Sequence, residues 1–125
     1  MDCRRGRMSF SEILKEAVEG VEGAVASIIL ASDGIPVEEY VRERLIDFND
    51  LSAEASTLIK DIEIAAEDLQ LGDAREFVLI TEKCGVFMRK ITEGYYVALV
   101  LKPDGNFGKA RFVLRTVVPK IEREF

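Results

Sequence analysis

The 125-residue sequence contains no histidine and no tryptophan, only two cysteines and only three prolines. The lack of histidine removes the commonest general base and the Ser-His and Cys-His nucleophile pairs. Cys3 and Cys84 lie far apart, so they do not form a zinc-binding pattern. The phosphate-binding patterns G-x-x-x-x-G-K-[ST] and G-x-G-x-x-G are also missing. We therefore expect a chain that is not an enzyme and that holds no metal and no cofactor.

Long hydrophobic runs are missing as well. No apolar stretch approaches the ~18 residues of a transmembrane helix, and the charged start M-D-C-R-R-G-R is not followed by the apolar region of a signal peptide. We therefore expect a cytoplasmic protein with reduced cysteines and no membrane insertion. Acidic residues outnumber basic ones by 23 to 17, and the net charge of −6 argues against nucleic acid as a partner.

The residues that are present describe one globular domain. The composition is 48% hydrophobic and 32% charged, which is typical of soluble domains. We expect a flexible basic tail over residues 1–8 and a single domain over residues 9–125. Ser9 and Glu12 match the capping box S-x-x-E that opens a helix, and Met8, just before it, is an alternative start to Met1.

Three amphipathic helices are predicted from apolar residues at helical spacing. The first follows Ser9 and is closed by Gly20 and Gly23. The second covers 51–70, with Asn49 or Asp50 as its N-cap and Gly72 as its C-cap. Its apolar stripe is Leu51, Ala55, Leu58, Ile59, Ile62, Ala65, Ala66 and Leu69. The third follows 103–106 and carries Pro119 on its outer face, where we expect a bend.

Five strands are predicted between these helices, at 24–31, 35–41, 76–81, 86–91 and 95–102. The segments 24–31 and 95–101 are apolar on both alternating faces, so they need cover on both sides and belong together at the centre of the sheet. The strand with Pro36 belongs at an edge, where its missing N–H costs nothing. The prediction is an α+β fold: a five-stranded antiparallel sheet with helices on both faces.

The strand at 76–81 does not suit the opposite edge, where the hairpin connections place it. It reads Phe77-Val78-Leu79-Ile80, and soluble proteins normally protect an apolar edge from pairing with other chains. Either a helix or loop of the same chain covers it, or a second copy continues the sheet across a two-fold axis.

Two segments resemble the roadblock family of dynein light chains and their bacterial and archaeal relatives. They are V-E-G-A-V-A-S-I-I-L-A-S-D-G-I-P-V at 21–37 and Y-Y-V-A-L-V-L-K-P-D-G-N-F-G-K-A-R at 95–111. Together with the order of the elements, the resemblance covers 9–125 and implies a profilin- or longin-like fold. The segment Y-V-R-E-R-L-I-D at 40–47 departs from the family by being longer and more charged.

The resemblance also implies partners. Family members dimerise through the long central helix and the edge strand beside it, and bacterial members such as MglB bind and stimulate a small Ras-like GTPase. For this chain it implies a homodimer and a small Ras-like GTPase as partners. The dimer interface is expected at Leu58, Ile62, Ala65, Leu69, Phe77, Val78, Leu79 and Ile80.

Two groups of residues are candidates for contact with the GTPase. On the second helix, Ile64 lies away from the apolar stripe, with Ala53, Thr57 and Lys60 on the same side. This side could contact the sister helix, the GTPase or both, or Ile64 could be an incidental exposed residue, which soluble proteins tolerate.

On the third helix, Phe112 stands opposite the apolar stripe, near Arg111 and Arg115. Phenylalanine and arginine are enriched at interfaces, although Phe112 could equally lie under a neighbouring loop. The expected function is a dimeric module that binds and regulates a small Ras-like GTPase. The alternatives are a structural adaptor without a GTPase and a sensor module of the PAS or GAF type. The two doubly apolar strands disfavour the ligand cavity of a sensor.

Overall fold

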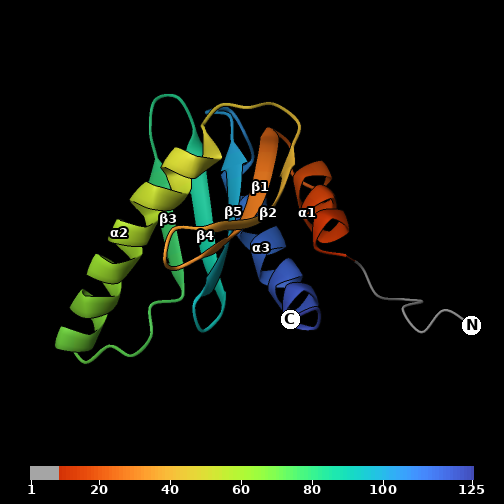
Figure 1. Ribbon diagram of the computed structural model, residues 1–125. Helices are drawn as coiled ribbons and strands as arrows, with labels where there is room; N and C mark the ends of the chain where they lie inside the picture. Colours follow the sequence, from red (N-terminus) through yellow and green to blue (C-terminus); the bar gives the residue numbers. More distant parts are fainter. Residues whose placement is uncertain (1–8) are drawn as a thin grey trace, which may run out of the picture.

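The computed structural model describes residues 9–125 and has the predicted order of elements (Figure 1). The elements are α1 (Phe10–Glu19), β1 (Ala24–Ala31), β2 (Pro36–Val41), α2 (Phe48–Asp68), β3 (Glu76–Ile80), β4 (Gly85–Thr92), β5 (Tyr95–Leu101) and α3 (Phe107–Glu122). Every strand begins and ends within one residue of its predicted boundary. The predicted basic tail lies outside the described residues. No helix within 9–125 is both long enough and apolar enough to span a bilayer.

The sheet has the order β2-β1-β5-β4-β3, and every neighbouring pair is antiparallel. As predicted, β1 and β5 lie side by side, and β2 and β3 are the edges. Ile29 and Leu99 face the core formed with α1 and α3. Ile28 and Ala98 face the core formed with α2, on the opposite side of the sheet (Figure 1). The two central strands are therefore buried on both faces because helices cover both faces.

The first and last helices begin as their sequences indicate. Ser9 and Glu12 form the predicted capping box, in which the Glu12 N–H donates to Ser9 Oγ (3.2 Å) and the Ser9 N–H donates to Glu12 Oε1 (3.0 Å). Asn106 caps α3 by accepting the N–H of Lys109 at Oδ1 (3.0 Å). Pro119 is exposed on the outer side of α3, as predicted.

The predicted start of α2 was wrong. The helix begins at Phe48, three residues before Leu51, and Asp47 is its N-cap. The Oδ1 of Asp47 accepts the N–H groups of Asn49 (2.8 Å) and Asp50 (3.2 Å). An N-cap side chain satisfies the N–H groups two and three residues further on. Asn49 and Asp50 are therefore the donors of the cap rather than the cap itself.

The predicted end of α2 at Gly72 was also wrong. The helix ends at Asp68, and Gln70 takes the left-handed conformation with φ of 58°. The Leu71 N–H then donates to the Ala66 carbonyl (2.8 Å), which is the closure of a Schellman motif. The chain turns at Gln70, where the backbone hydrogen bonds offset the cost of a left-handed non-glycine residue.

α2 buries only part of the predicted apolar stripe, Ala55 and Ile59, together with residues on the adjoining side of the helix. Its Ser56 hydroxyl donates to the Ser32 carbonyl in the β1–β2 turn (2.8 Å), and a Cβ on Gly34 of that turn would lie 3.4 Å from Ser56 Cβ. This close approach holds Ser56 against the β1–β2 turn, and Leu58 and Ile62 remain exposed. The buried residues of α2 are Phe48, Ser52, Ala55, Ser56 and Ile59.

Candidate functional site

The outer edge of β3 has free backbone hydrogen-bonding groups. The Thr81 N–H donates to the Cys84 carbonyl (2.8 Å), and the Arg75 carbonyl accepts the Lys90 N–H (2.9 Å), so Arg75 and Thr81 point their backbone groups toward β4. Backbone direction alternates along a strand. The N–H and C=O groups of Glu76, Val78 and Ile80 therefore point outward, where residues 9–125 supply no further strand.

The side chains along this edge are apolar and accessible. Val78, Leu79 and Ile80 are between 43% and 56% exposed. Between β3 and α2 lies an apolar groove of about 190 Å³ lined by Leu51, Leu58, Ile62, Phe77, Leu79 and Met88, among others. An exposed strand edge that continues into an apolar groove is the kind of surface that another chain covers.

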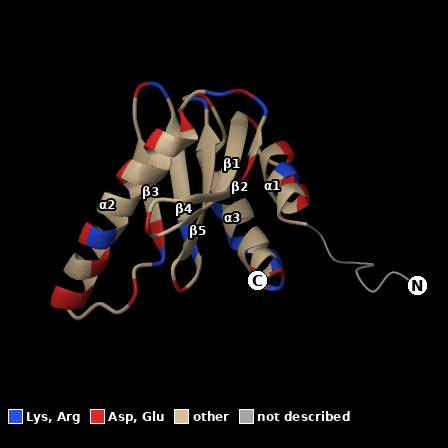
Figure 2. Ribbon diagram, viewed as in Figure 1, with Lys and Arg blue, Asp and Glu red and all other residues tan. Residues whose placement is uncertain are grey.

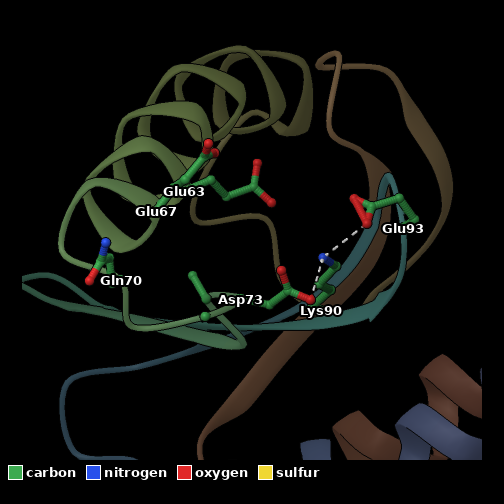
Figure 3. Close-up of a pocket in the computed structure, with 8 residues that line it drawn as sticks. Glu63, Glu67, Gln70, Asp73, Lys90 and Glu93 are labelled. Carbon is green, nitrogen blue, oxygen red and sulfur yellow. Dashed lines mark hydrogen bonds and ion pairs between the residues drawn. The ribbon is translucent and has the colours of Figure 1, made fainter.

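A second depression lies on the other side of α2, and it is acidic (Figure 3). This cleft of about 560 Å³ is lined by Glu63, Glu67, Gln70, Asp73, Lys90 and Glu93, among others. Lys90 Nζ lies 3.4 Å from Glu93 and 4.0 Å from Asp73. Within the described residues, no group of three or more His, Cys, Asp or Glu side chains is arranged to hold a metal ion.

Tyr96 of β5 connects the sheet to Glu63, a residue of α2 that lines the acidic cleft. Its ring is buried and stacks on Phe77 with 5.6 Å between centroids, and its hydroxyl donates to Glu63 Oε2 at 2.7 Å. Burial, this hydrogen bond and the nearby negative charge of Glu63 all raise the pKa of Tyr96. The phenol therefore stays protonated to a higher pH than an ordinary tyrosine and keeps its hydrogen bond to Glu63.

Arg111 and Glu76 join α3 to the edge strand. The Arg111 guanidinium donates to both carboxylate oxygens of Glu76, at 3.2 and 2.7 Å, and Arg89 lies 3.7 Å from the same carboxylate. The hydrogen bonds from Arg111 hold the pKa of Glu76 below its ordinary value of 4.5. Arg111 therefore has a structural partner within its own chain.

This ion pair predicts a pH-dependent stability. Because the pKa of Glu76 is lower in the folded state, its contribution is present above pH 4.5 and is lost as pH falls below that value. We expect Glu76→Gln to lower the free energy of unfolding by about 1 kcal/mol at pH 7, a modest value because Arg111 is half exposed. Urea denaturation at pH 7 and pH 3 measures it. An equal deficit at both pH values would contradict the prediction.

Comparison with known proteins gives relatives among solved structures. MglC from Myxococcus xanthus is 37% identical, with 94% of this chain and 100% of MglC covered and a TM-score of 0.69. The chain belongs to the roadblock family. No family model and no curated protein matches the sequence.

Two further structures share the fold of this roadblock domain at low sequence identity. A Roadblock/LC7 domain from Streptomyces avermitilis is 15% identical, covers 94% of this chain and 98% of its own, and has a TM-score of 0.83. MglB from Thermus thermophilus is 16% identical, covers 90% and 84%, and has a TM-score of 0.81. The predicted fold class is confirmed, with profilins as more distant neighbours.

The roadblock domain carries the two predicted contact groups on opposite faces of its sheet (Figure 1). On α2, Ile64 is 58% exposed, and Ala53, Thr57 and Lys60 are exposed as well. On α3, Phe112 is 61% exposed, and Arg115 is also exposed. The two groups form separate surfaces.

Sequence reasoning missed part of the groove and all of the cleft of the roadblock domain. Val86 and Met88 of β4 line the groove, and their place in the strand next to the edge was the available signal. Asp73 lies in the loop after α2 and Glu93 in the β4–β5 turn, and both line the cleft together with Glu63 and Glu67 of α2. These segments are far apart in the sequence, so no local pattern predicts that they lie side by side.

Proposed function

We propose that this roadblock domain forms a homodimer through β3 and the adjoining side of α2. The outward-pointing backbone groups of β3 are the observation that supports it most directly, because a second copy related by a two-fold axis can pair with them. Pairing centred on Val78 would set Glu76 opposite Ile80 of the second copy. The exposed side chains Leu58, Ile62, Ala65 and Leu69 lie on α2, and Leu58 and Ile62 line the groove beside this edge.

We further propose that the dimer binds and regulates a small Ras-like GTPase through the outer side of α2. Ile64 supports this proposal, because it is an exposed isoleucine on the side of the helix away from the groove. That side stays accessible when a second copy occupies the groove. In this proposal the catalytic groups belong to the GTPase, and the roadblock domain positions the GTPase's switch segments.

Replacing Ile64 with aspartate tests the GTPase surface. Burying an isoleucine contributes roughly 1.5–3 kcal/mol, and about 1.4 kcal/mol corresponds to tenfold in affinity. We expect Ile64→Asp to weaken binding to the GTPase more than tenfold and to leave the fold intact. Binding is measured by calorimetry with the small Ras-like GTPases of the same organism, each loaded with GDP or a non-hydrolysable GTP analogue.

The mass of the roadblock domain is measured by light scattering on the same sample. Loss of the dimer would assign this side of α2 to the sister chain. Phe112→Asp is the matched comparison, since Phe112, of the other candidate group, is equally exposed on the opposite face. Loss of binding in Phe112→Asp instead of Ile64→Asp would move the GTPase surface to α3. If no GTPase binds the unmodified protein, the regulator function fails and a structural adaptor remains. Nucleotide hydrolysis by the roadblock domain alone would contradict the expectation that it is not an enzyme.

A further inference from the structure

α2 carries a dense negative charge. Between Phe48 and Asp68 the helix carries six acidic residues and one lysine, a net charge of −5 in a chain whose net charge is −6 (Figure 2). Its last turn contains Glu67 and Asp68 and no basic residue. Negative side chains there lie at the negative end of the helix dipole, which destabilises the helix. This placement therefore needs another explanation.

Ile64 lies in the middle of these charges. Its neighbours on the helix surface, three and four residues away, are Lys60, Asp61, Glu67 and Asp68. All four are exposed, as Ile64 is. An apolar side chain is thus framed by three carboxylates and one ammonium group. The acidic cleft adjoins the same half of α2 through Glu67 (Figure 3).

A second copy of the chain does not fit this side of α2. Pairing of this side with itself would bring the exposed carboxylates Asp61, Glu67 and Asp68 against a second set of the same three, and like charges repel at short range. The surface suited to a second copy also lies elsewhere on the helix. Ile62 of the groove and Ile64 are two residues apart, which is about 200° around a helix.

We propose that the outer side of α2, centred on Ile64, binds a protein surface that is an apolar socket rimmed by lysine and arginine. The inference rests on the proposed function, in that the GTPase is the protein expected to present this surface. Opposite charges at the rim accelerate encounter and exclude acidic partners, while the apolar centre supplies the anchor. Binding of this kind weakens as salt is added.

Three synthetic peptides of equal length serve as probes: an amphipathic peptide of leucine and arginine, one of serine and arginine, and one of leucine and glutamate. Each is titrated into the full chain with isotope-labelled isoleucine methyl groups. We expect only the leucine–arginine peptide to shift the Ile64 methyl signal with a saturable curve. We also expect its affinity to fall at least fivefold between low and physiological salt.

Charge-neutralising variants distinguish an effect on peptide binding from an effect on the stability of the fold. Asp61→Asn with Asp68→Asn is expected to weaken the leucine–arginine peptide about fivefold and to raise the melting temperature slightly, because Asp68 opposes the helix dipole. Glu19→Gln with Glu122→Gln removes the same charge from the exposed surfaces of α1 and α3 and is expected to leave affinity almost unchanged.

Several results would overturn the proposal. If the serine–arginine peptide bound as tightly as the leucine–arginine peptide, no apolar anchor would be involved. If the leucine–glutamate peptide bound as tightly, the surface would have no preference for basic partners. Shifts at Ile62 instead of Ile64 would place binding in the groove. A chain shortened to start at Met8 is compared with the full chain without peptide. A different Ile64 methyl signal in the shortened chain would assign the surface to the basic N-terminal segment. A peptide that binds at Ile64 while no GTPase binds refutes the proposed function alone, and the reverse result refutes this inference alone.

Discussion

Replacing Val78 with proline is expected to dissociate the homodimer and to leave each protomer folded. The Val78 N–H points away from β4, so proline removes no hydrogen bond within the chain. In the proposed pairing it removes one ladder donor from each chain, and each lost hydrogen bond costs about 1–1.5 kcal/mol. Proline is also sterically unsuited to a paired strand. We expect the dimer dissociation constant to rise at least about 100-fold.

Sedimentation of the protein over a range of dilutions measures this change. Glu39→Pro in β2 is the control. The Arg42 N–H donates to the Val25 carbonyl in β1, so alternation points the Glu39 N–H to the other free edge of the sheet, where it donates to the exposed side chain of Glu38 (3.2 Å). That variant should keep the mass of the unmodified protein. An undisturbed dimer in Val78→Pro would mean that β3 is not part of the interface and that α2 alone, or another surface, holds the two copies together.

Replacing Gly23 with alanine is expected to lower the free energy of unfolding by about 3 kcal/mol or more, a large part of a typical 5–15 kcal/mol. Gly23 has φ of +86°, and a Cβ there would lie 2.4 Å from the Cα of Gly105. Neither backbone can yield easily, because the Lys102 N–H donates to the Gly23 carbonyl and the Asn106 N–H donates to the Glu22 carbonyl, both at 2.9 Å.

Gly72→Ala isolates the steric part of this effect. Gly72 has nearly the same φ, +85°, but a Cβ there would meet nothing within 4 Å. It should therefore show only the cost of a left-handed alanine, about 1–2 kcal/mol. Urea denaturation of both variants measures the difference. If Gly23→Ala costs no more than Gly72→Ala, the contact with Gly105 does not constrain the fold.

The contact between Gly23 and Gly105 joins the two distant segments that resemble the roadblock family. V-E-G at 21–23 and P-D-G-N at 103–106 belong to the two quoted stretches, and in the structure their backbones lie against each other. The sequence placed Gly23 at the close of the first helix and 103–106 at the start of the last one. It did not reveal that a side chain at position 23 would collide with the backbone of Gly105.

Features that depend on residues close in the chain were determined by the sequence. The capping box at Ser9 follows from two side chains three residues apart. The central position of β1 and β5 follows from apolar residues on both alternating faces, and the edge position of β2 agrees with Pro36. Hydrogen bonding and burial along one short segment decide each of these, so the pattern of residue types was sufficient.

Features that depend on close approach of distant segments were decided only by the tertiary structure. α2 has apolar residues on more than one side, and its periodicity could not say which side would pack. The β1–β2 turn at Gly34 accepts only small side chains, so Ser56 turns toward the sheet and Leu58 turns outward. The pairing of Arg111 with Glu76 arises in the same way, because α3 lies beside the edge strand. Shape complementarity between segments far apart in the chain thus determined which apolar side of α2 stays free for a partner.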